Sequence, residues 1–381
     1  MKSFEIKTKI HFGDGALDRL KNLPYKKVLV ITDPFVTESG MIEHITRPLS
    51  ESDIEYSLFN DVVPDPPIQK ISVGVKKLTE YRPEAIIAIG GGSAMDSAKA
   101  IKQVALNAGA CGNVPLIAIP TTSGTGSEVT AFAVITEPEV NKKYPLVSYD
   151  MIPDEAILDA ELVKSVPPSV TADTGMDVFT HALEAYVSIN NNEFSAALSE
   201  KAIEICGAFL LRSYFSNEDN HARKKMHVAS CLAGLAFNSA SLGLNHGIAH
   251  AIGAKFHIPH GRANAMVLPH VIEFNSDINK HSKSKQQYLP AVRKYVNVAK
   301  LLGLTNFNEI TTVRALVSWT EFMMKEMNMP LNIAQCGIEH DEYFDAIDQM
   351  AENAINDACT ATNPRKPMKE DVIRILKNMY D

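Results

Sequence analysis

Short apolar runs separated by amphipathic stretches dominate the first part of the chain. The segments Val28–Ile31, Ile86–Ile89 and Leu116–Ile119 are apolar at every position, which is typical of parallel strands covered on both faces. Helical periodicity lies between such runs, for example from Asp96 to Leu106. This alternation predicts a doubly wound, Rossmann-like α/β domain over residues 1–165. The strands that we expect are Phe4–His11, Lys27–Thr32, Glu55–Phe59, Ala85–Ile89, Pro115–Ile119, Ala131–Thr136 and Glu155–Leu158.

The pattern changes after Pro167 and Pro168. From Ser169 to Asp381 strand-like alternation is almost absent, and apolar residues recur at helical spacing. The two prolines stand where a helix would begin. We therefore predict a second, all-α domain over residues 166–381, which follows the α/β domain.

Composition and charge narrow the class of protein. The hydrophobic content of 45% and the charged content of 22% are those of a soluble globular protein. The net charge of −8, without a basic arm, argues against nucleic acid as a partner. The five cysteines include no C-x-x-C pair, which favours reduced thiols. No signal peptide and no 18-residue apolar run are evident, so we expect no membrane partner and a cytoplasmic location.

Histidines and one aspartate recur at helical spacing in the second half. Asp177 and His181 lie four residues apart, as do His246 and His250, and His260 follows. Several imidazoles and one carboxylate among apolar residues are suitable ligands for a divalent transition metal. A single pair of this kind is more often a hydrogen bond on a helix surface. Spacing alone also leaves open which three histidines would bind.

Two polar turns follow successive strands of the expected sheet. Gly90-Gly91-Gly92-Ser93 leads from a strand into a helix, and the run from Thr121 to Glu128 follows the next strand. Both lie at the carboxyl edge of a parallel sheet, where open α/β sheets bind nucleotides, so the pair favours a dinucleotide site. Each turn alone could equally be a tight connection or a helix cap. Asp33, at another strand end, could bind a ribose and favour NAD over NADP, or belong to a simple Asp-Pro turn.

Four runs in this order and spacing resemble the iron-containing (group III) alcohol dehydrogenases. The runs are G-G-G-S-x-x-D, T-T-x-G-T-x-S-E, G-M-D-x-x-T-H-A-x-E and H-G-x-A-H…P-H-G-x-A-N-A. Within that family the chain looks closest to the short-chain primary alcohol dehydrogenases, a group that includes the 1-propanol dehydrogenase of propanediol utilisation. The resemblance extends from Phe12 to about Asn275 and is fainter afterwards.

The resemblance implies a nucleotide-binding α/β domain, a helical catalytic domain, and an active site in the cleft between them. It implies a metal held by Asp177, His181, His246 and His260, with His250 beside the ligands as a proton relay. Fe²⁺ is the expected ion and Zn²⁺ the alternative. It also implies contacts with NAD(H) from a set of residues in the first domain. They are Asp33, Gly91, Gly92, Ser93, Asp96, Thr121, Thr122, Thr125 and Lys143.

The expected function is therefore the interconversion of short-chain primary alcohols, such as ethanol, 1-propanol and 1-butanol, and aldehydes by hydride transfer with NAD(H). One alternative is another enzyme of this fold, a zinc polyol dehydrogenase of the glycerol type or a dehydroquinate-synthase-like lyase. A second is a catalytically silent, metal-binding relative. The resemblance further implies a homodimer, with a higher oligomer as the alternative. A bacterial microcompartment is the alternative to a free cytoplasmic location.

Overall fold

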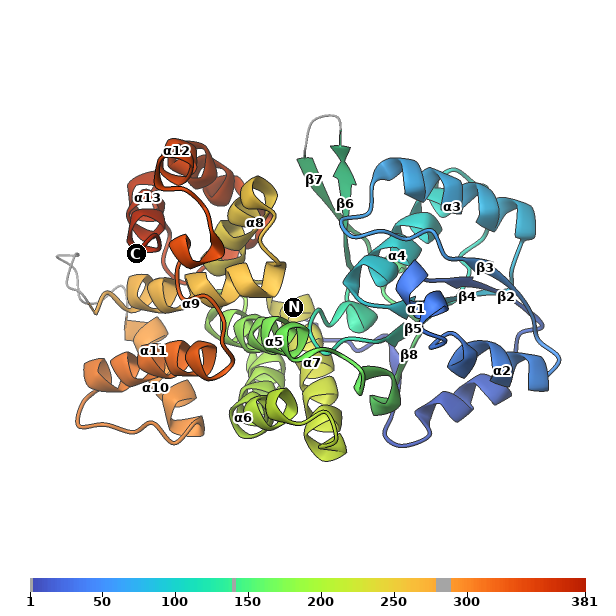
Figure 1. Cartoon of the computed structure of the whole chain (residues 1–381), viewed down its shortest axis with the longest axis horizontal. Helices are drawn as coiled ribbons and strands as arrows, with labels where there is room; N and C mark the ends of the chain where they lie inside the picture. Colours follow the sequence, from blue (N-terminus) through green and yellow to red (C-terminus); the bar gives the residue numbers. More distant parts are fainter. Residues whose placement is uncertain (1–2, 139–141, 279–288) are drawn as a thin grey trace. The chain divides into compact units, whose positions relative to one another are not determined.

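The computed structural model describes residues 3–138, 142–278 and 289–381. The chain divides into two compact units, residues 1–165 and residues 166–381. Figure 1 shows a sheet flanked by helices in the first unit and a bundle of helices in the second. Each unit is described by itself below.

Six parallel strands form the sheet of the first unit, in the order β1-β8-β5-β4-β2-β3. Non-consecutive neighbours in this order require crossover connections, which the helices between the strands provide. The expected parallel α/β fold of this unit is thus confirmed. The strands are β1 (Lys9–Phe12), β2 (Lys27–Ile31), β3 (Glu55–Phe59), β4 (Ala85–Gly90), β5 (Leu116–Pro120) and β8 (Glu155–Leu158).

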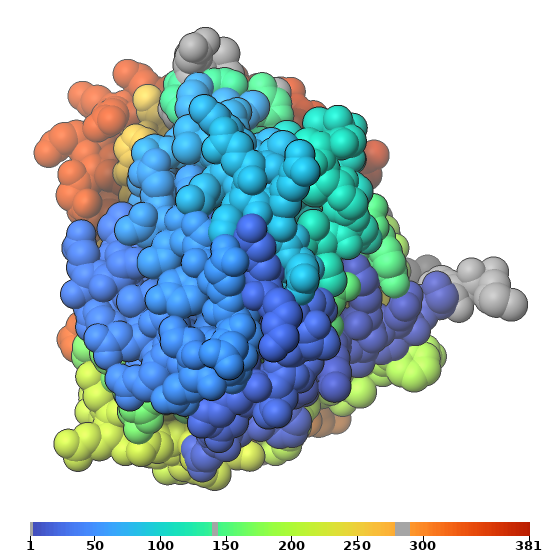
Figure 2. All heavy atoms as spheres, turned by 90° about the vertical axis from the view of Figure 1, so that its right-hand side faces the viewer, coloured from blue at the N-terminus to red at the C-terminus, as the bar shows by residue number. Residues whose placement is uncertain are grey.

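Both faces of this sheet are buried, as the uninterrupted apolar runs predict. Successive residues of β2 alternate between two hydrophobic clusters: Leu29 and Ile31 belong to one, Val28 and Val30 to the other. Side chains from the flanking helices complete each cluster, so the strands lie inside the unit (Figure 1). The helices are α1 (Pro34–Glu38), α2 (Glu43–Glu51), α3 (Ile68–Tyr81) and α4 (Gly92–Asn107). In Figure 2 the early part of the chain, blue to cyan, covers the face turned to the viewer.

Two expected strands differ from the observed ones. The first begins at Lys9 rather than Phe4, because its neighbour β8 begins only at Glu155 and pairs with it from Lys9 onward. The segment Ala131–Thr136 was expected as one more strand of the alternating α/β pattern. Instead β6 (Phe132–Glu137) pairs antiparallel with β7 (Lys142–Val147) in a separate hairpin. Alternation of apolar and polar residues identifies a strand but not its partner, so the sequence did not reveal this hairpin.

Helices account for the second unit, as expected. Pro168 occupies the first position of the first helix, where its missing N–H costs no hydrogen bond. One large hydrophobic cluster unites the unit, and it includes buried residues from most of the helices. The helices are α5 (Pro168–Val187), α6 (Glu193–Phe215), α7 (Asn220–Ala240), α8 (Leu244–Phe256), α9 (His260–Ser276), α10 (Leu289–Leu301), α11 (Glu309–Glu326), α12 (His340–Asn356) and α13 (Lys369–Asn378).

In the described parts of the chain, no single helix is both long and apolar enough to cross a membrane. Helices α7 and α8 pass the test of length and composition only when they are taken together, and they meet at an angle of 107°. Apolar residues of both helices belong to the hydrophobic cluster of the second unit.

Candidate metal centre and nucleotide turns

Helix α5 carries three buried polar side chains on one face. Asp177, His181 and Glu184 follow one another at intervals of four and three residues, so they lie in one row along the helix. Their exposed fractions are 3%, 4% and 4%. Three polar groups buried in one row of an otherwise apolar helix require polar partners, because an unpaired buried polar group is costly.

The partners come from α8 and α9. His246 lies in the first turn of α8, and His260 is the first residue of α9. A sharp break precedes α8, where Ser241 has a φ of 62° and Gly243 follows. A Cβ on Gly243 would lie 2.8 Å from Oε1 of Glu184, so only glycine lets the chain pass this close to α5. The break thus sets the start of α8 against the polar row of α5.

The side chains of Asp177, His181, His246 and His260 converge on one point. One ligand atom from each lies within 4.8 Å of the others. Oδ1 of Asp177 is 3.9 Å from Nε2 of His246 and 3.6 Å from Nε2 of His260, and its Oδ2 is 3.9 Å from Nδ1 of His181. Tetrahedral coordination with bonds of about 2.1 Å would place ligand atoms about 3.4 Å apart. One carboxylate oxygen and three imidazole nitrogens at nearly this spacing fit Fe²⁺ or Zn²⁺.

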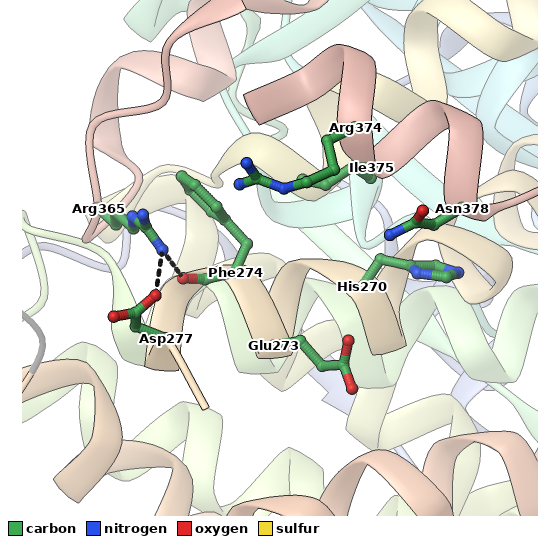
Figure 3. Close-up of a pocket in the computed structure, with 8 residues that line it drawn as sticks. All are labelled: His270, Glu273, Phe274, Asp277, Arg365, Arg374, Ile375 and Asn378. Atoms are coloured by element: carbon green, nitrogen blue, oxygen red, sulfur yellow. Dashed lines mark hydrogen bonds and ion pairs between the residues drawn. The ribbon is translucent and has the colours of Figure 1, made fainter. Parts of the chain in front are cut away.

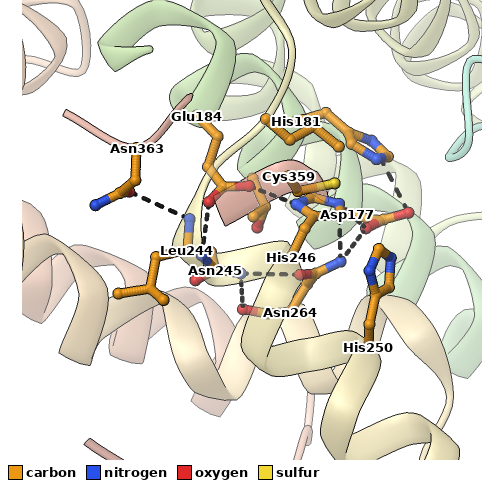
Figure 4. A network of polar contacts seen from close by, with 12 residues as sticks. Asp177, His181, Glu184, Leu244, Asn245, His246, His250, Asn264, Cys359 and Asn363 are labelled. Atoms are coloured by element: carbon orange, nitrogen blue, oxygen red, sulfur yellow. Dashed lines mark hydrogen bonds and ion pairs between the residues drawn. The ribbon is translucent and has the colours of Figure 1, made fainter. Parts of the chain in front are cut away.

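Glu184 contacts the ring of His246 on the side away from the other candidate ligands and fixes its orientation (Figure 4). Oε2 of Glu184 is 2.5 Å from Nδ1 of His246, and Oε1 accepts the backbone N–H of Asn245 at 2.7 Å. Burial raises the pKa of Glu184, although the backbone N–H groups that donate to its oxygens oppose this effect. Burial also holds the pKa of His246 well below its usual value, so the ring is neutral near pH 7. A carboxylate behind a histidine directs the ring's other nitrogen towards a metal.

Glu184 is the last residue of the motif G-M-D-x-x-T-H-A-x-E, but the motif alone does not indicate what this side chain does. Its position seven residues after Asp177 was the available signal, because that spacing places it on the same helix face. What it contacts depends on the break before α8, which no local pattern of α5 reveals.

His250 lies next to this group but outside it. Its Nδ1 is 2.8 Å from Oδ2 of Asp357, which follows α12. Its ring stacks on that of His260 with a centroid distance of 5.4 Å and an interplanar angle of 19°. Spacing alone allowed His246 and His250 to bind together. The structure instead assembles the four donors without His250, which pairs with Asp357.

In the first unit, the two polar turns and Asp33 lie at one edge of the sheet. β4 has β2 on one side and β5 on the other, so the residues that follow these three strands are neighbours. In the sheet, β3 lies on one side of β2, and β4, the next strand in the sequence, lies on the other side of β2. The order of strands therefore reverses between β2 and β4, which is where open α/β sheets bind ligands.

Glycine is required where these segments approach one another. Gly90 has a φ of 146°, and a Cβ there would lie 3.0 Å from Oδ2 of Asp33. A Cβ on Gly92 would lie 2.9 Å from Cγ2 of Thr125, whereas one on Gly91 would make an ordinary contact of 3.6 Å with Cγ2 of Thr122. The glycine turn thus presents backbone without side chains and lies close to the second turn. Such a backbone would allow the close approach of a pyrophosphate.

Other expected cofactor residues also lie at this edge. Ser93 is half-buried in the first turn of α4, and the backbone N–H of Thr121 donates to the carbonyl of Gly90 at 2.9 Å. Oδ1 of Asp33 accepts the N–H of Val36 and caps α1. The Asp-Pro turn is therefore real, and Oδ2 is the oxygen that faces Gly90. Lys143 lies in β7, opposite Thr136, but its side chain is outside the described part of the structure.

Asp96, another of the predicted cofactor contacts, lies in α4 and hydrogen-bonds to two neighbouring segments. One carboxylate oxygen accepts a hydrogen bond from Ser127 Oγ at 2.9 Å, and the other accepts the N–H of Val134 at 3.0 Å. Nζ of Lys99, which is fully buried, donates to the same Ser127 hydroxyl at 2.8 Å. Both oxygens of Asp96 therefore connect α4 to the second turn and β6. In this structure Asp96 thus supports the second turn, and its contact with the cofactor stays a prediction.

A small pocket of the second unit contains none of the predicted site residues (Figure 3). It holds about 40 Å³, which is room for water but not for a dinucleotide. One of the two arginines that line it, Arg365, donates to the carbonyl of Phe274 at 2.6 Å and stacks over that ring. The lining is His270, Glu273, Phe274, Asp277, Arg365, Arg374, Ile375 and Asn378.

The sequence matches a family described as "Iron-containing alcohol dehydrogenase" over residues 7–160 and the C-terminal part of the same family over residues 171–380. The chain belongs to the iron-containing alcohol dehydrogenase family. The resemblance inferred from the four runs is thereby confirmed, and it also covers the C-terminal residues where the motifs were fainter.

Individual members of the family are similar along their whole length. The 1-propanol dehydrogenase PduQ of Citrobacter freundii is 42% identical over 371 residues, which are 96% of each chain. An NADPH-dependent butanol dehydrogenase of Clostridium saccharobutylicum is 38% identical, covering 100% of this chain and 98% of the other. The solved structure of a 1,3-propanediol oxidoreductase superposes with a TM-score of 0.91 at 29% identity, over 100% of both chains. This chain is therefore an oxidoreductase that interconverts alcohols and aldehydes.

Proposed function

We propose that the chain interconverts short-chain primary alcohols and their aldehydes with Fe²⁺ and NAD(H). Ethanol, 1-propanol and 1-butanol are the proposed alcohols. The convergence of Asp177, His181, His246 and His260 is the observation that carries the proposal. Support for the substrate class comes from similar proteins that are named 1-propanol dehydrogenase and butanol dehydrogenase.

The ion would act as a Lewis acid for the alcohol oxygen, and the nicotinamide coenzyme would carry the hydride. As ligands of the ion, one carboxylate and three imidazoles would lower the net positive charge of the site by the single charge of Asp177. Glu184 keeps the ring of His246 turned so that Nε2 faces the other ligands. The side chain of His260 is 43% exposed, whereas Asp177 and His246 are buried, so the site is open on the side of His260.

His250 is suited to move the alcohol proton. Asp357 accepts a hydrogen bond from Nδ1, which leaves the lone pair of Nε2 free to take a proton. The side chain is 34% exposed, so the proton can pass on to solvent. In the reverse direction the same nitrogen would return a proton to the product alkoxide.

The discrimination between NADH and NADPH provides a test of the coenzyme site. Asp33→Asn keeps an oxygen that can cap α1 but removes the charge that would repel a 2′-phosphate. We expect the ratio of kcat/KM for NADPH to that for NADH to rise at least about tenfold, since like charges in contact are costly. Steady-state assays of the variant and the parent measure this ratio. An unchanged ratio would exclude Asp33 as the selecting residue.

A substrate and metal panel tests the function itself. The protein, stripped with a chelator and then supplied with Fe²⁺ or Zn²⁺ without oxygen, is assayed by NADH absorbance with propanal, 1-propanol, 1-butanol and glycerol. We expect activity with propanal and the two monoalcohols, which disappears with the chelator and returns with the ion. Preference for glycerol with Zn²⁺ would indicate a polyol dehydrogenase. No turnover with any of these compounds would indicate a silent relative.

We also propose a cytoplasmic homodimer. All five cysteines are free, which supports a reducing compartment. β1 is the last strand at its end of the sheet, with an exposed Phe12, and such an edge offers surface to a second copy. Light scattering coupled to size-exclusion chromatography gives the mass in solution, and a monomeric mass would refute the dimer.

A further inference from the structure

Asn264 contacts three of the four candidate ligands. It lies on α9, one turn after His260, and its side chain is fully buried. Its amide nitrogen Nδ2 is 2.8 Å from Oδ1 of Asp177, 3.1 Å from Nε2 of His246 and 3.1 Å from Nε2 of His260. Three of the four donors proposed for the metal ion thus point at one amide group.

A second asparagine determines which way this amide faces. Nδ2 of Asn245 donates to Oδ1 of Asn264 at 2.9 Å and to its backbone carbonyl at 3.1 Å. Oδ1 is therefore turned towards Asn245, and Nδ2 towards the ligands. Glu184 closes the ring of contacts, because it binds the backbone N–H of Asn245 and Nδ1 of His246 (Figure 4). The orientation of Asn264 is set by its neighbours on α5 and α8.

These contacts and metal coordination use the same lone pairs. An amide nitrogen only donates hydrogen bonds, so Nε2 of His246 and of His260 must each be the acceptor. An imidazole nitrogen has one lone pair, which can face either the amide hydrogen or a cation. A carboxylate oxygen has more than one, so the contact with Asp177 can persist. Coordination by both histidines therefore requires Asn264 to release at least two of its three contacts.

We propose that Asn264 competes with the metal ion for His246 and His260. In this arrangement it keeps the ligands together before an ion binds, and its contacts are given up on binding. The amide has two hydrogens for three acceptors, so it satisfies the ligands only in part. The inference rests on the proposed metal site, and it assigns Asn264 a positioning function that sets the affinity for the ion.

If Asn264 competes with the ion, its removal should make the protein bind Zn²⁺ more tightly. Asn264→Ala leaves acceptors unpaired in the absence of an ion but costs little once the histidines coordinate one. The Kd for Zn²⁺, measured by competition with a chelator, should therefore fall about tenfold, given the usual cost of an unpaired buried acceptor. The temperature of unfolding should drop more with chelator than with Zn²⁺. Asn264→Ser keeps one donor, so its Kd should lie between those of Ala and the parent.

Asn275→Ala is a matched control on the same helix. Asn275 is also buried, but it contacts Tyr295 and Asn363 rather than the ligands, so its loss should leave the Kd for Zn²⁺ unchanged. A higher or unchanged Kd in both variants of Asn264 would overturn the inference, and a higher Kd would indicate that Asn264 supports the bound ion. Failure of the parent protein to bind Zn²⁺ or Fe²⁺ would overturn the proposed metal site itself.

Discussion

Contacts between residues distant in sequence separate the candidate ligands from their neighbour His250. The two pairs at spacing four, Asp177 with His181 and His246 with His250, are equivalent in the sequence. They differ in the structure because His250 meets Asp357, which is 107 residues away. A helical period identifies residues on one face, but it cannot show which partner that face meets. The sequence thus predicted the chemistry of the site, while the distinction between ligand and neighbour came from the family resemblance.

Substitution of His250 tests its proposed function as a proton relay. His250→Ala should lower kcat about a hundredfold, because a positioned acid–base group contributes at least that much. Metal content should stay at the parent value, since the ring is not among the four converging donors. Asp357→Asn, which keeps the shape but not the charge, should lower kcat less. Steady-state assays and elemental analysis measure both quantities, and loss of the ion from His250→Ala would make this residue a ligand.

At the scale of secondary-structure elements, the site depends on the close approach of α5 and α9. A Cβ on Gly261 would lie 2.1 Å from the backbone oxygen of Asp173, so the two helices touch without a side chain between them. Arg262 fixes the same crossing, because its guanidinium binds both oxygens of Asp173 at 3.2 and 3.0 Å. This crossing places His260 beside Asp177.

Gly261→Ala should therefore weaken the metal site as well as the fold. The added methyl group must push α9 from α5, at a cost of about 1–3 kcal/mol in the free energy of unfolding. Chelator competition should show weaker binding of Zn²⁺, because His260 moves away from Asp177. Gly253→Ala on α8 is the control, since its Cβ would lie 3.4 Å from the nearest atom, the carbonyl oxygen of Ile258. Equal effects of the two substitutions would argue against the crossing as the cause.

Elements whose pattern is local were predicted best. β3 and β8 have the expected bounds, and the apolar run of β2 ends one residue before the expected Thr32. The hairpin of β6 and β7 was missed, because β7 contains Pro145 and lacks a continuous apolar run. The approach of Asp33 to Gly90 depends on the pairing of β2 with β4, whose residues are separated by more than fifty positions. Such pairing is a property of the sheet and not of either strand.

For the molecule as a whole, burial of ionisable groups makes stability depend on pH. His227 on α7 is 2% exposed, and burial lowers its pKa to about 4, from about 6.5 in an unfolded chain. Between these values the unfolded chain binds the proton and the folded unit does not. The free energy of unfolding therefore suffers no loss from His227 above pH 6.5, and it decreases as the pH drops from 6.5 towards 4.

The resulting prediction concerns acid unfolding. His227→Phe removes the titrating group, so the loss of stability between pH 7 and pH 4 should shrink by up to about 3 kcal/mol relative to the parent. Urea unfolding at a series of pH values measures the difference, and the comparison of variant with parent cancels the contribution of the ligand histidines. Parallel curves for the two proteins would show that His227 is not responsible.

The central claim is that four side chains of the second unit hold one ion that alcohol oxidation requires. The most direct measurement is the metal content of the anaerobically purified parent and of His260→Ala, together with their activity on 1-propanol. We expect one ion in each parent chain, and neither ion nor activity in the variant, whose fold should persist because this side chain is 43% exposed. A variant that keeps its ion and the activity of the parent would contradict the account.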